Sequence, residues 1–459
     1  MPRQLALLLC SVFVFYLLKY DRKQSIGVSW VLWVPTLWMF SITSRSINAW
    51  LGGGGGDAET GGGWDHIFQA ALFCIGSMVL LRRKLNWAEA IRNNLWLSVL
   101  IGWMLISIVW SDMPLISFKS WVKEILAVVM ALVVLTEPEP KQAMQKLFRR
   151  TIYILVPFSV LLIKYYPNLG VSYNRHFGEV QWLGVTLQKN SLGQLCLIAI
   201  FFITWTLIKR WKGRDKSVGR LQTGAEVLVL LMAAWLLKGP SIGGASATAL
   251  YVLSMALAAL FSLLWMKKHR VELGANIWIL VIACIIGLGV VTPLAGGGTI
   301  TGFTSAVGRD ATLTGRTEIW AGLLPELMRQ PVLGYGFAGF WTVMRTAEHE
   351  IGQAHNGYLE IWLQLGFVGL LLTVAWLLSC ARKARRILQY DFDWGCLCLC
   401  FVLMTVTESI TESAIDSLNR PLTAIVLLLS ISAQGLTRRR EIHENTFAPT
   451  PIIASAHSK

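Results

Sequence analysis

Residues 354–372 read AHNGYLEIWLQLGFVGLLL, and this stretch decides how the rest of the chain is interpreted. It begins with a titratable His355 and an amide, Asn356, and then stays apolar as far as Cys380. An apolar run of this length is what an α-helix needs to cross the hydrocarbon core of a bilayer. The imidazole is therefore predicted where water meets the membrane, so it can exchange protons while the helix below it is fixed in lipid.

The whole chain repeats this apolar character. Of its 459 residues 54% are hydrophobic and 15% are charged, and the mean hydropathy is +0.55, whereas soluble domains carry roughly 25% charged residues. Apolar runs long enough to span a bilayer recur from end to end, which predicts an all-α fold: a polytopic transmembrane helical bundle of about 12–13 spans. The predicted spans are 5–18, 26–42, 66–81, 94–110, 117–135, 151–165, 191–208, 224–237, 247–266, 275–292, 356–380, 394–411 and 421–436.

The net charge of +15 is distributed as a topology signal. More than half of the 41 Lys and Arg lie in alternate loops between the predicted spans, and the positive-inside rule places those loops in the cytoplasm. A nucleic-acid site would need one contiguous basic face, so that class of partner is not expected. Thirteen spans with an inside C-terminus put the N-terminus on the outer side.

Two outer loops are expected to carry the function. We predict one polytopic membrane domain over 1–440, with loops 166–190 and 293–355 forming the active site, and a disordered cytoplasmic tail over 441–459. The longer loop should contain short amphipathic helices, because structureless loops of that length are uncommon. The segment 316–329 places Trp320, Leu323 and Leu327 on one side at helical spacing, which predicts a helix lying on the membrane surface. The glycine-aromatic turn 331–341 then offers close backbone approach and flat apolar surface to sugar rings.

Outer cations are few, so each calls for a reason. Arg175, Lys189, Arg309 and Arg316 fall in the two informative loops. A diphosphate carries two to three negative charges, and guanidinium groups bind it through paired N–H donors. The alternative is that each Arg pairs with lipid phosphate or a carboxylate such as Glu318.

His355 has two interpretations as well. A neutral imidazole can take a proton from a sugar hydroxyl, which typically contributes about 10²–10⁴ in rate. A His before a helix can also only cap it or pack against Trp362. Further along, Glu408 and Glu412 share one helical face near the outer end of their span and either line the same cavity or pair with Arg420. No metal-ligand spacing is present, because His349 and His355 do not share a helical face.

Three motifs in order resemble a known family. His355 and Asn356 are followed after nine residues by Gly366, and then by Gly369. The second motif is GRTEIW (315–320) followed by the turn GYGF (334–337), and the third is WLGVTLQKNSLG (182–193). Together they resemble the bacterial superfamily of O-antigen ligases and O-antigen and exopolysaccharide polymerases, which transfer glycans at the inner membrane. The resemblance covers roughly residues 170–380.

The resemblance implies a metal-independent, inverting glycosyltransferase without cofactors. It would sit in the inner (cytoplasmic) membrane as a multi-pass protein with its active site facing the periplasm. The donor would be a glycan on undecaprenyl diphosphate, and the acceptor lipid A core for a ligase or a lipid-linked glycan for a polymerase; membrane lipids complete the partners. Carried over by motif, His355 and Arg316 are the implied catalytic residues, and Arg175 would help to hold the diphosphate. By their position, further candidate substrate-binding residues are Arg309, Lys189, Asn356, Tyr335 and Glu318.

Two other classes of function were weighed. A flippase or transporter of lipid-linked oligosaccharide would need a charged path across the bilayer and often repeated halves, and the sequence shows no internal repeat. A scaffold protein of an envelope complex would not require outer Arg and His together. Between ligase and polymerase, Trp320 stands where the ligase motif R-x-x-x-L has Leu, which favours an exopolysaccharide polymerase.

Overall fold

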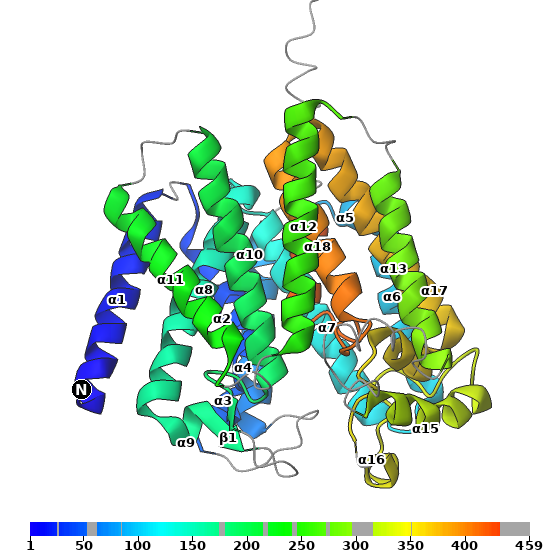
Figure 1. Ribbon diagram of the computed structural model, residues 1–459. Coiled ribbons are helices and arrows are strands. Elements are labelled where there is room, and N and C mark those ends of the chain that lie inside the picture. The colour runs from blue at the N-terminus through cyan, green and yellow to red at the C-terminus, as the bar shows by residue number, and fades with distance from the viewer. Residues whose placement is uncertain are drawn as a thin grey trace, which may run out of the picture.

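The structure, a computed structural model, describes residues 1–24, 27–52, 62–83, 85–173, 180–213, 219–240, 246–271, 276–295, 315–349 and 351–431. Within these ranges the secondary structure is helical apart from one antiparallel strand pair, β1 (Val171–Tyr173) and β2 (Val180–Trp182). The fold is an all-α polytopic helical bundle, as the sequence predicts (Figure 1).

The helices in the first half of the chain are α1 (Arg3–Gln24), α2 (Trp33–Thr43), α3 (Ile47–Trp50), α4 (Gly63–Arg82), α5 (Trp87–Asn93), α6 (Leu95–Ile106), α7 (Pro114–Leu135), α8 (Pro140–Tyr165), α9 (Pro167–Gly170) and α10 (Lys189–Gly213). Two 3₁₀ turns, η1 (Trp30–Leu32) and η2 (Ser107–Trp110), adjoin α2 and α6. The second half has α11 (Arg220–Lys238), α12 (Ala247–His269), α13 (Ile277–Leu294), α15 (Arg316–Arg329), α16 (Val343–His349), α17 (Gly357–Tyr390) and α18 (Phe392–Glu408). A shorter apolar helix, Pro421–Ile431, follows.

Each of the thirteen predicted spans contains a helix. Among the described residues, 7 helices are long and apolar enough to cross a membrane alone. The bent pair of α5 with α6 and η2, which turns by 94°, makes the total 8 if it counts as one span. Helices such as α7, α8 and α18 fall outside this test, so the number of 12–13 spans stays a prediction.

The loops of the two predicted sets lie at opposite ends of the bundle. Figure 1 shows α3, α9, β1, α15 and α16 together at the lower end and α5 at the upper end. The start of α1 also lies at the lower end (Figure 1), where thirteen alternating spans would put it. We call the lower end, which carries α15 and α16, the outer end, and the opposite end, rich in Lys and Arg, the basic end.

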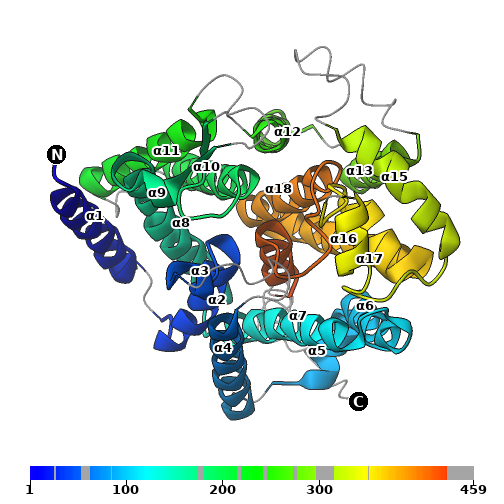
Figure 2. The same ribbon diagram turned by 90° about the horizontal axis from the view of Figure 1, so that it is seen from below.

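The helices α18 and Pro421–Ile431 form the centre of the bundle. Figure 2, seen from the outer end, shows them in orange and dark red with other helices on several sides. Every residue of α18 from Trp394 to Glu408 is buried, as are residues 422–431. Apolar residues packed on all sides identify a core helix rather than a lipid-facing one. The loop between these two helices, 409–420, is therefore anchored at both ends in the core, at the outer end of the bundle.

The helix α17 is broken at Gly366, where the backbone adopts φ 69°. A Cβ at Gly366 would lie 2.0 Å from the carbonyl oxygen of Val332, so the position admits only glycine. The turn 331–336 hydrogen-bonds into this break: the Tyr335 N–H donates to the Leu363 carbonyl at 3.0 Å, and the Phe367 N–H donates to the Pro331 carbonyl at 2.9 Å. The glycine motif thus joins the outer turn to the membrane helix.

The helix predicted over 316–329 is confirmed as α15, with the same ends. Its predicted environment was wrong. Trp320, Leu323 and Leu327 do not face lipid; they are at most 1% exposed and pack in a second hydrophobic core with the start of α17. The aromatic residues of the turn 331–341 are buried in the same way, so the structure does not offer them as a flat surface for sugar rings. The apolar side chains that the sequence pattern assigned to lipid and ligand are packed against other parts of the protein instead.

Candidate active site

His355 is held in place by the start of α17. The following residue, Asn356, is the N-cap: its side-chain oxygen accepts the Leu359 N–H at 2.9 Å, and its amide donates to the carbonyls of Gly289 and Ile410 at 3.0 Å each. His355 itself has φ 49°, a left-handed conformation that costs a non-glycine residue about 1–2 kcal/mol. Such strain persists only where the surroundings impose it. The backbone of His355 therefore has a defined conformation, and 26% of the side chain is exposed.

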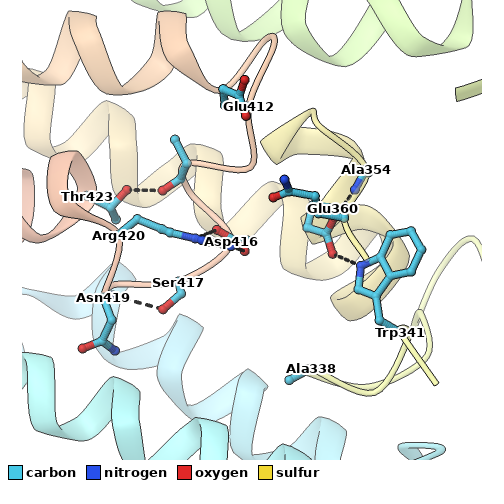
Figure 3. A network of polar contacts seen from close by, with 12 residues as sticks. Ala338, Trp341, Ala354, Glu360, Glu412, Asp416, Ser417, Asn419, Arg420 and Thr423 are labelled. Carbon is cyan, nitrogen blue, oxygen red and sulfur yellow. Dashed lines mark hydrogen bonds and ion pairs between the residues drawn. The ribbon is translucent and has the colours of Figure 1, made fainter. Parts of the chain in front are cut away.

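A buried carboxylate fixes the backbone just before His355. Glu360, in the first turn of α17 and 1% exposed, accepts the Ala354 N–H at 2.7 Å, the Trp341 indole N–H at 2.6 Å and the Gln364 amide at 2.8 Å. Figure 3 shows Glu360 between Ala354 and Trp341. Buried carboxylates need such donors, because an unsatisfied one is costly. Glu360 therefore ties the residue ahead of His355 to the helix that follows it.

Glu412 is where three distant segments meet. Its Oε1 accepts from the Arg316 guanidinium at 2.5 Å and from the Asn190 amide at 2.7 Å. Its Oε2 lies 3.4 Å from His355 Nδ1. Arg316 is the first residue of α15, Asn190 lies in the first turn of α10, and Glu412 follows α18. The Arg316 and Glu412 side chains are each 14% exposed, so the cluster is shielded but reachable from the outer end.

The loop that carries Glu412 is held in place by hydrogen bonds to α17 and α7. Its Ser409 carbonyl accepts the Gly357 N–H at 2.8 Å, which joins it directly to the start of α17. The buried Glu124 of α7 accepts the Ser417 hydroxyl and the Leu418 N–H at 2.6 Å each. This bracing fixes the position of Glu412 relative to His355.

Further charges surround the cluster. Asp416 binds Arg420 through two bonds, of 2.9 and 2.7 Å, and the charge of Asp416 raises the pKa of Arg420 (Figure 3). Glu408 accepts the Gln194 amide at 2.7 Å, one turn from the Asn190 bond to Glu412. The site is therefore rich in carboxylates, and Arg316 and Arg420 supply compensating positive charge.

Comparison with known proteins finds two similarities. The sequence profile of the family "O-Antigen ligase" matches residues 242–374, which include Arg316 and His355. The chain is also similar to the "Exopolysaccharide production protein ExoQ" of Rhizobium meliloti (strain 1021), with 24% identity over 320 residues, 66% of this chain and 68% of that protein.

Over part of its length the chain is therefore similar to the O-antigen ligase and polysaccharide polymerase superfamily. The apolar helices and this similarity indicate a multi-pass membrane protein, and the similarity supports glycosyl transfer of the ligase or polymerase type. The resemblance drawn from the three sequence motifs is confirmed.

The predicted site residues fall into three groups. Arg316 and His355 come together on Glu412. Lys189 is half-buried and adjacent to Asn190, whereas Glu318 is exposed on the first turn of α15. Arg175 and Arg309 lie outside the described residues. The roles predicted for all of these side chains stay predictions.

Two residues predicted to bind ligand, Asn356 and Tyr335, make contacts that hold the fold together. Asn356 is 0% exposed, with its amide committed to the bonds described above. Tyr335 is 4% exposed and donates its hydroxyl to the Glu326 carboxylate at 2.8 Å; burial, followed by this bond, raises its pKa to about 12. Asn356 therefore places His355, and Tyr335 fastens α15 to the glycine turn. Their contact with substrate stays a prediction.

Sequence reasoning missed Asn190 and Glu360 and left Glu412 with two possible roles. Glu412 pairs with Arg316, whereas Arg420 pairs with Asp416, so the predicted pairing of Glu412 with Arg420 was wrong. One signal was available for Glu360: a carboxylate inside an apolar run calls for a buried partner. Asn190 lies within the motif WLGVTLQKNSLG, but nothing in the sequence relates α10 to the loop after α18, so its contact with Glu412 had no such signal.

Proposed function

We propose that the protein transfers a glycan from undecaprenyl diphosphate to a glycan acceptor on the periplasmic face of the inner membrane, without a metal or cofactor. One observation carries the proposal: Arg316 and His355, from separate segments of the outer end, converge on Glu412 with a 2.5 Å bond and a 3.4 Å contact. An anion-binding group and a proton acceptor in one shielded place are what displacement of a diphosphate by a hydroxyl requires.

Arg316 would serve the leaving group. The undecaprenyl diphosphate departs as an anion, and a guanidinium can stabilise its oxygens through paired N–H donors. Arg316 is only 14% exposed, so its charge acts in a medium that screens it less than bulk water. The loop residues Arg175, Arg309 and Lys189 are further candidates for the same diphosphate.

His355 would serve the acceptor. In the proposed step, a neutral imidazole takes the proton from an acceptor hydroxyl, and that oxygen bonds to the anomeric carbon of the donor sugar. The bond from this carbon to the diphosphate oxygen breaks, and its electron pair leaves with the diphosphate toward Arg316. A single displacement of this kind inverts the anomeric configuration.

The acceptor is lipid A core for a ligase or a lipid-linked glycan for a polymerase, and we propose the polymerase. The similarity to an exopolysaccharide production protein spans 66% of the chain and supports this choice. Glycans from a deletion strain separate the two. Loss of long chains with intact lipid A core supports the polymerase, and lipid-linked long chains that fail to reach lipid A contradict it in favour of a ligase.

Transfer by the purified protein tests the activity. His355→Ala should lose about 10²–10⁴ in transfer rate while it still binds the lipid-linked donor. His269→Ala, at the basic-end terminus of α12, is the matched control and should behave as wild type. Unchanged transfer in His355→Ala rejects the role as base. Movement of the lipid-linked glycan across vesicles without a new glycosidic bond would instead establish the flippase alternative.

A further inference from the structure

Glu412 bridges the two groups that the proposed reaction keeps apart. One oxygen is bonded to Arg316, the proposed diphosphate ligand, and the other faces His355, the proposed base. Glu412 lies outside residues 242–374, the part of the chain matched by the O-antigen ligase profile. The family comparison therefore says nothing about this carboxylate, whereas its two contacts in the structure indicate a role.

The two contacts of Glu412 differ in quality. The bond to Arg316 measures 2.5 Å, which is a close charge-assisted hydrogen bond. The contact with His355 Nδ1 measures 3.4 Å, longer than an N–H···O hydrogen bond of normal length. In this state the carboxylate is engaged mainly by Arg316 and holds the imidazole only loosely. Gln353, whose amide nitrogen lies 3.4 Å from both ring nitrogens, does not fix the ring more tightly.

A bound diphosphate would change this balance. It carries more negative charge than one carboxylate and offers several oxygens to the guanidinium, so it competes directly with Glu412 for Arg316. Asn190 also binds Oε1, so the carboxylate stays tethered when Arg316 turns away. A small side-chain rotation about this tether shortens the contact from Oε2 to His355.

We propose that Glu412 is a positioning residue that couples donor binding to the base. Without donor it neutralises Arg316. When the donor diphosphate takes Arg316, Glu412 closes on the Nδ1–H of His355, fixes that tautomer, and leaves Nε2 unprotonated toward the acceptor hydroxyl. This inference rests on the proposed transferase function. It makes the base fully competent only after the donor has bound, so the acceptor hydroxyl is activated only in the donor complex.

Glu412→Gln provides a test with two opposite effects. The variant removes the charge that competes for Arg316, so the KM for the lipid-linked donor should fall about 3- to 10-fold. It also removes the anionic partner of His355, so kcat should fall about 10- to 100-fold, as for other orienting carboxylates. A merely structural role would lower the yield of folded protein or raise KM, and it would not lower kcat and KM together.

Asp112→Asn is the matched control. Asp112 pairs with Arg345 at 2.8 Å near the outer end, so its substitution makes the same change of charge in an ion pair that touches neither Arg316 nor His355. An unchanged or raised donor KM in Glu412→Gln, or a kcat within about threefold of Asp112→Asn, overturns the inference. If the wild type does not transfer glycan, the proposed function has failed, and if His355→Ala transfers normally, the role of His355 as base has failed. If the wild type is active and His355→Ala is inactive, only the coupling has failed.

A second measurement avoids any variant of Glu412. The ¹⁵N signals of the His355 ring, assigned by their loss in His355→Gln, are followed in the labelled full-length protein as undecaprenyl diphosphate is added. The coupling predicts that the ¹⁵N chemical shift of Nδ1 changes toward that of a more strongly hydrogen-bonded nitrogen as the protein is saturated with undecaprenyl diphosphate. Unchanged ring signals at saturation contradict the coupling, and absence of any binding contradicts the proposed donor itself.

Discussion

Ion pairs at the two ends of the bundle differ in burial and in chemistry. At the basic end, Glu137 and Asp21 are 0% and 1% exposed and pair with Arg83 at 2.7 Å and Arg149 at 2.6 Å. At the outer end, Glu412 is 14% exposed and is shared by an arginine, an amide and an imidazole. Breaking a buried ion pair costs much free energy, whereas a partly exposed carboxylate with several possible partners can exchange one partner for another.

The comparison assigns different work to the two ends. The basic end uses the buried carboxylates of Glu137 and Asp21 to fix helices to one another, because these two groups lie out of reach of solvent. The outer end keeps Arg316 and His355 near a carboxylate that a ligand can displace. Substitutions at the basic end should therefore change stability, and substitutions at the outer end should change activity.

The largest expected effect is on stability at the basic end. Asp21→Asn removes the buried carboxylate that pairs with Arg149, which should cost about 3–5 kcal/mol of unfolding free energy. Thermal unfolding in detergent measures this as a large drop in midpoint. Asp391→Asn is the control, because the Asp391 side chain, which pairs with Lys141, is 29% exposed. Asparagine can still cap α18, so at most about 1 kcal/mol of unfolding free energy should be lost. Equal losses in both variants would contradict the proposed division of labour.

A smaller effect is expected where the outer turn meets the membrane helix. Gly366→Ala forces a side chain into a left-handed conformation with its Cβ 2.0 Å from the Val332 carbonyl. Backbone strain and overpacking together should cost about 2–4 kcal/mol. Thermal unfolding gives the loss, and Gly102→Ala in α6, where a Cβ meets nothing within 4 Å, should be neutral or stabilising. A Gly366→Ala protein as stable as wild type would show that the break in α17 is not required.

The smallest effect is expected from Arg316→Lys at the outer end. Lysine keeps the charge but loses the paired donors, so the donor KM should rise about 10- to 30-fold with little loss of stability. Steady-state transfer kinetics measure it. Arg329→Lys, at the exposed far end of the same helix with 69% of its side chain exposed, is the control and should match wild type. A donor KM that does not change in Arg316→Lys would remove Arg316 from the donor site.

The sequence predicts the fold well because its signals are local. Apolar runs located a helix in each of the thirteen predicted spans, and the spacing of Trp320, Leu323 and Leu327 predicted α15 from end to end. The same pattern did not reveal what α15 packs against, because periodicity identifies an apolar face and not its partner. An apolar helix face can pack against either lipid or the protein core, and the sequence pattern is the same in both cases.

The site was predicted only in part. Motifs pointed to His355 and Arg316 and to their placement at the outer end. Their meeting on Glu412, with Asn190 beside them, depends on how α10, α15 and the loop after α18 pack, and no spacing in the sequence encodes that arrangement. Polar residues scattered over distant helix ends become a site only through tertiary packing.

A double-mutant cycle between Arg316 and His355 tests most directly whether they serve one reaction. Transfer rates of Arg316→Ala, His355→Ala and the double variant are compared with wild type, with donor saturating. Groups that act as a unit are strongly non-additive, so the double variant should be about as slow as the slower single variant. A double variant slowed by the full product of the two single effects would show that Arg316 and His355 act independently, contrary to this account.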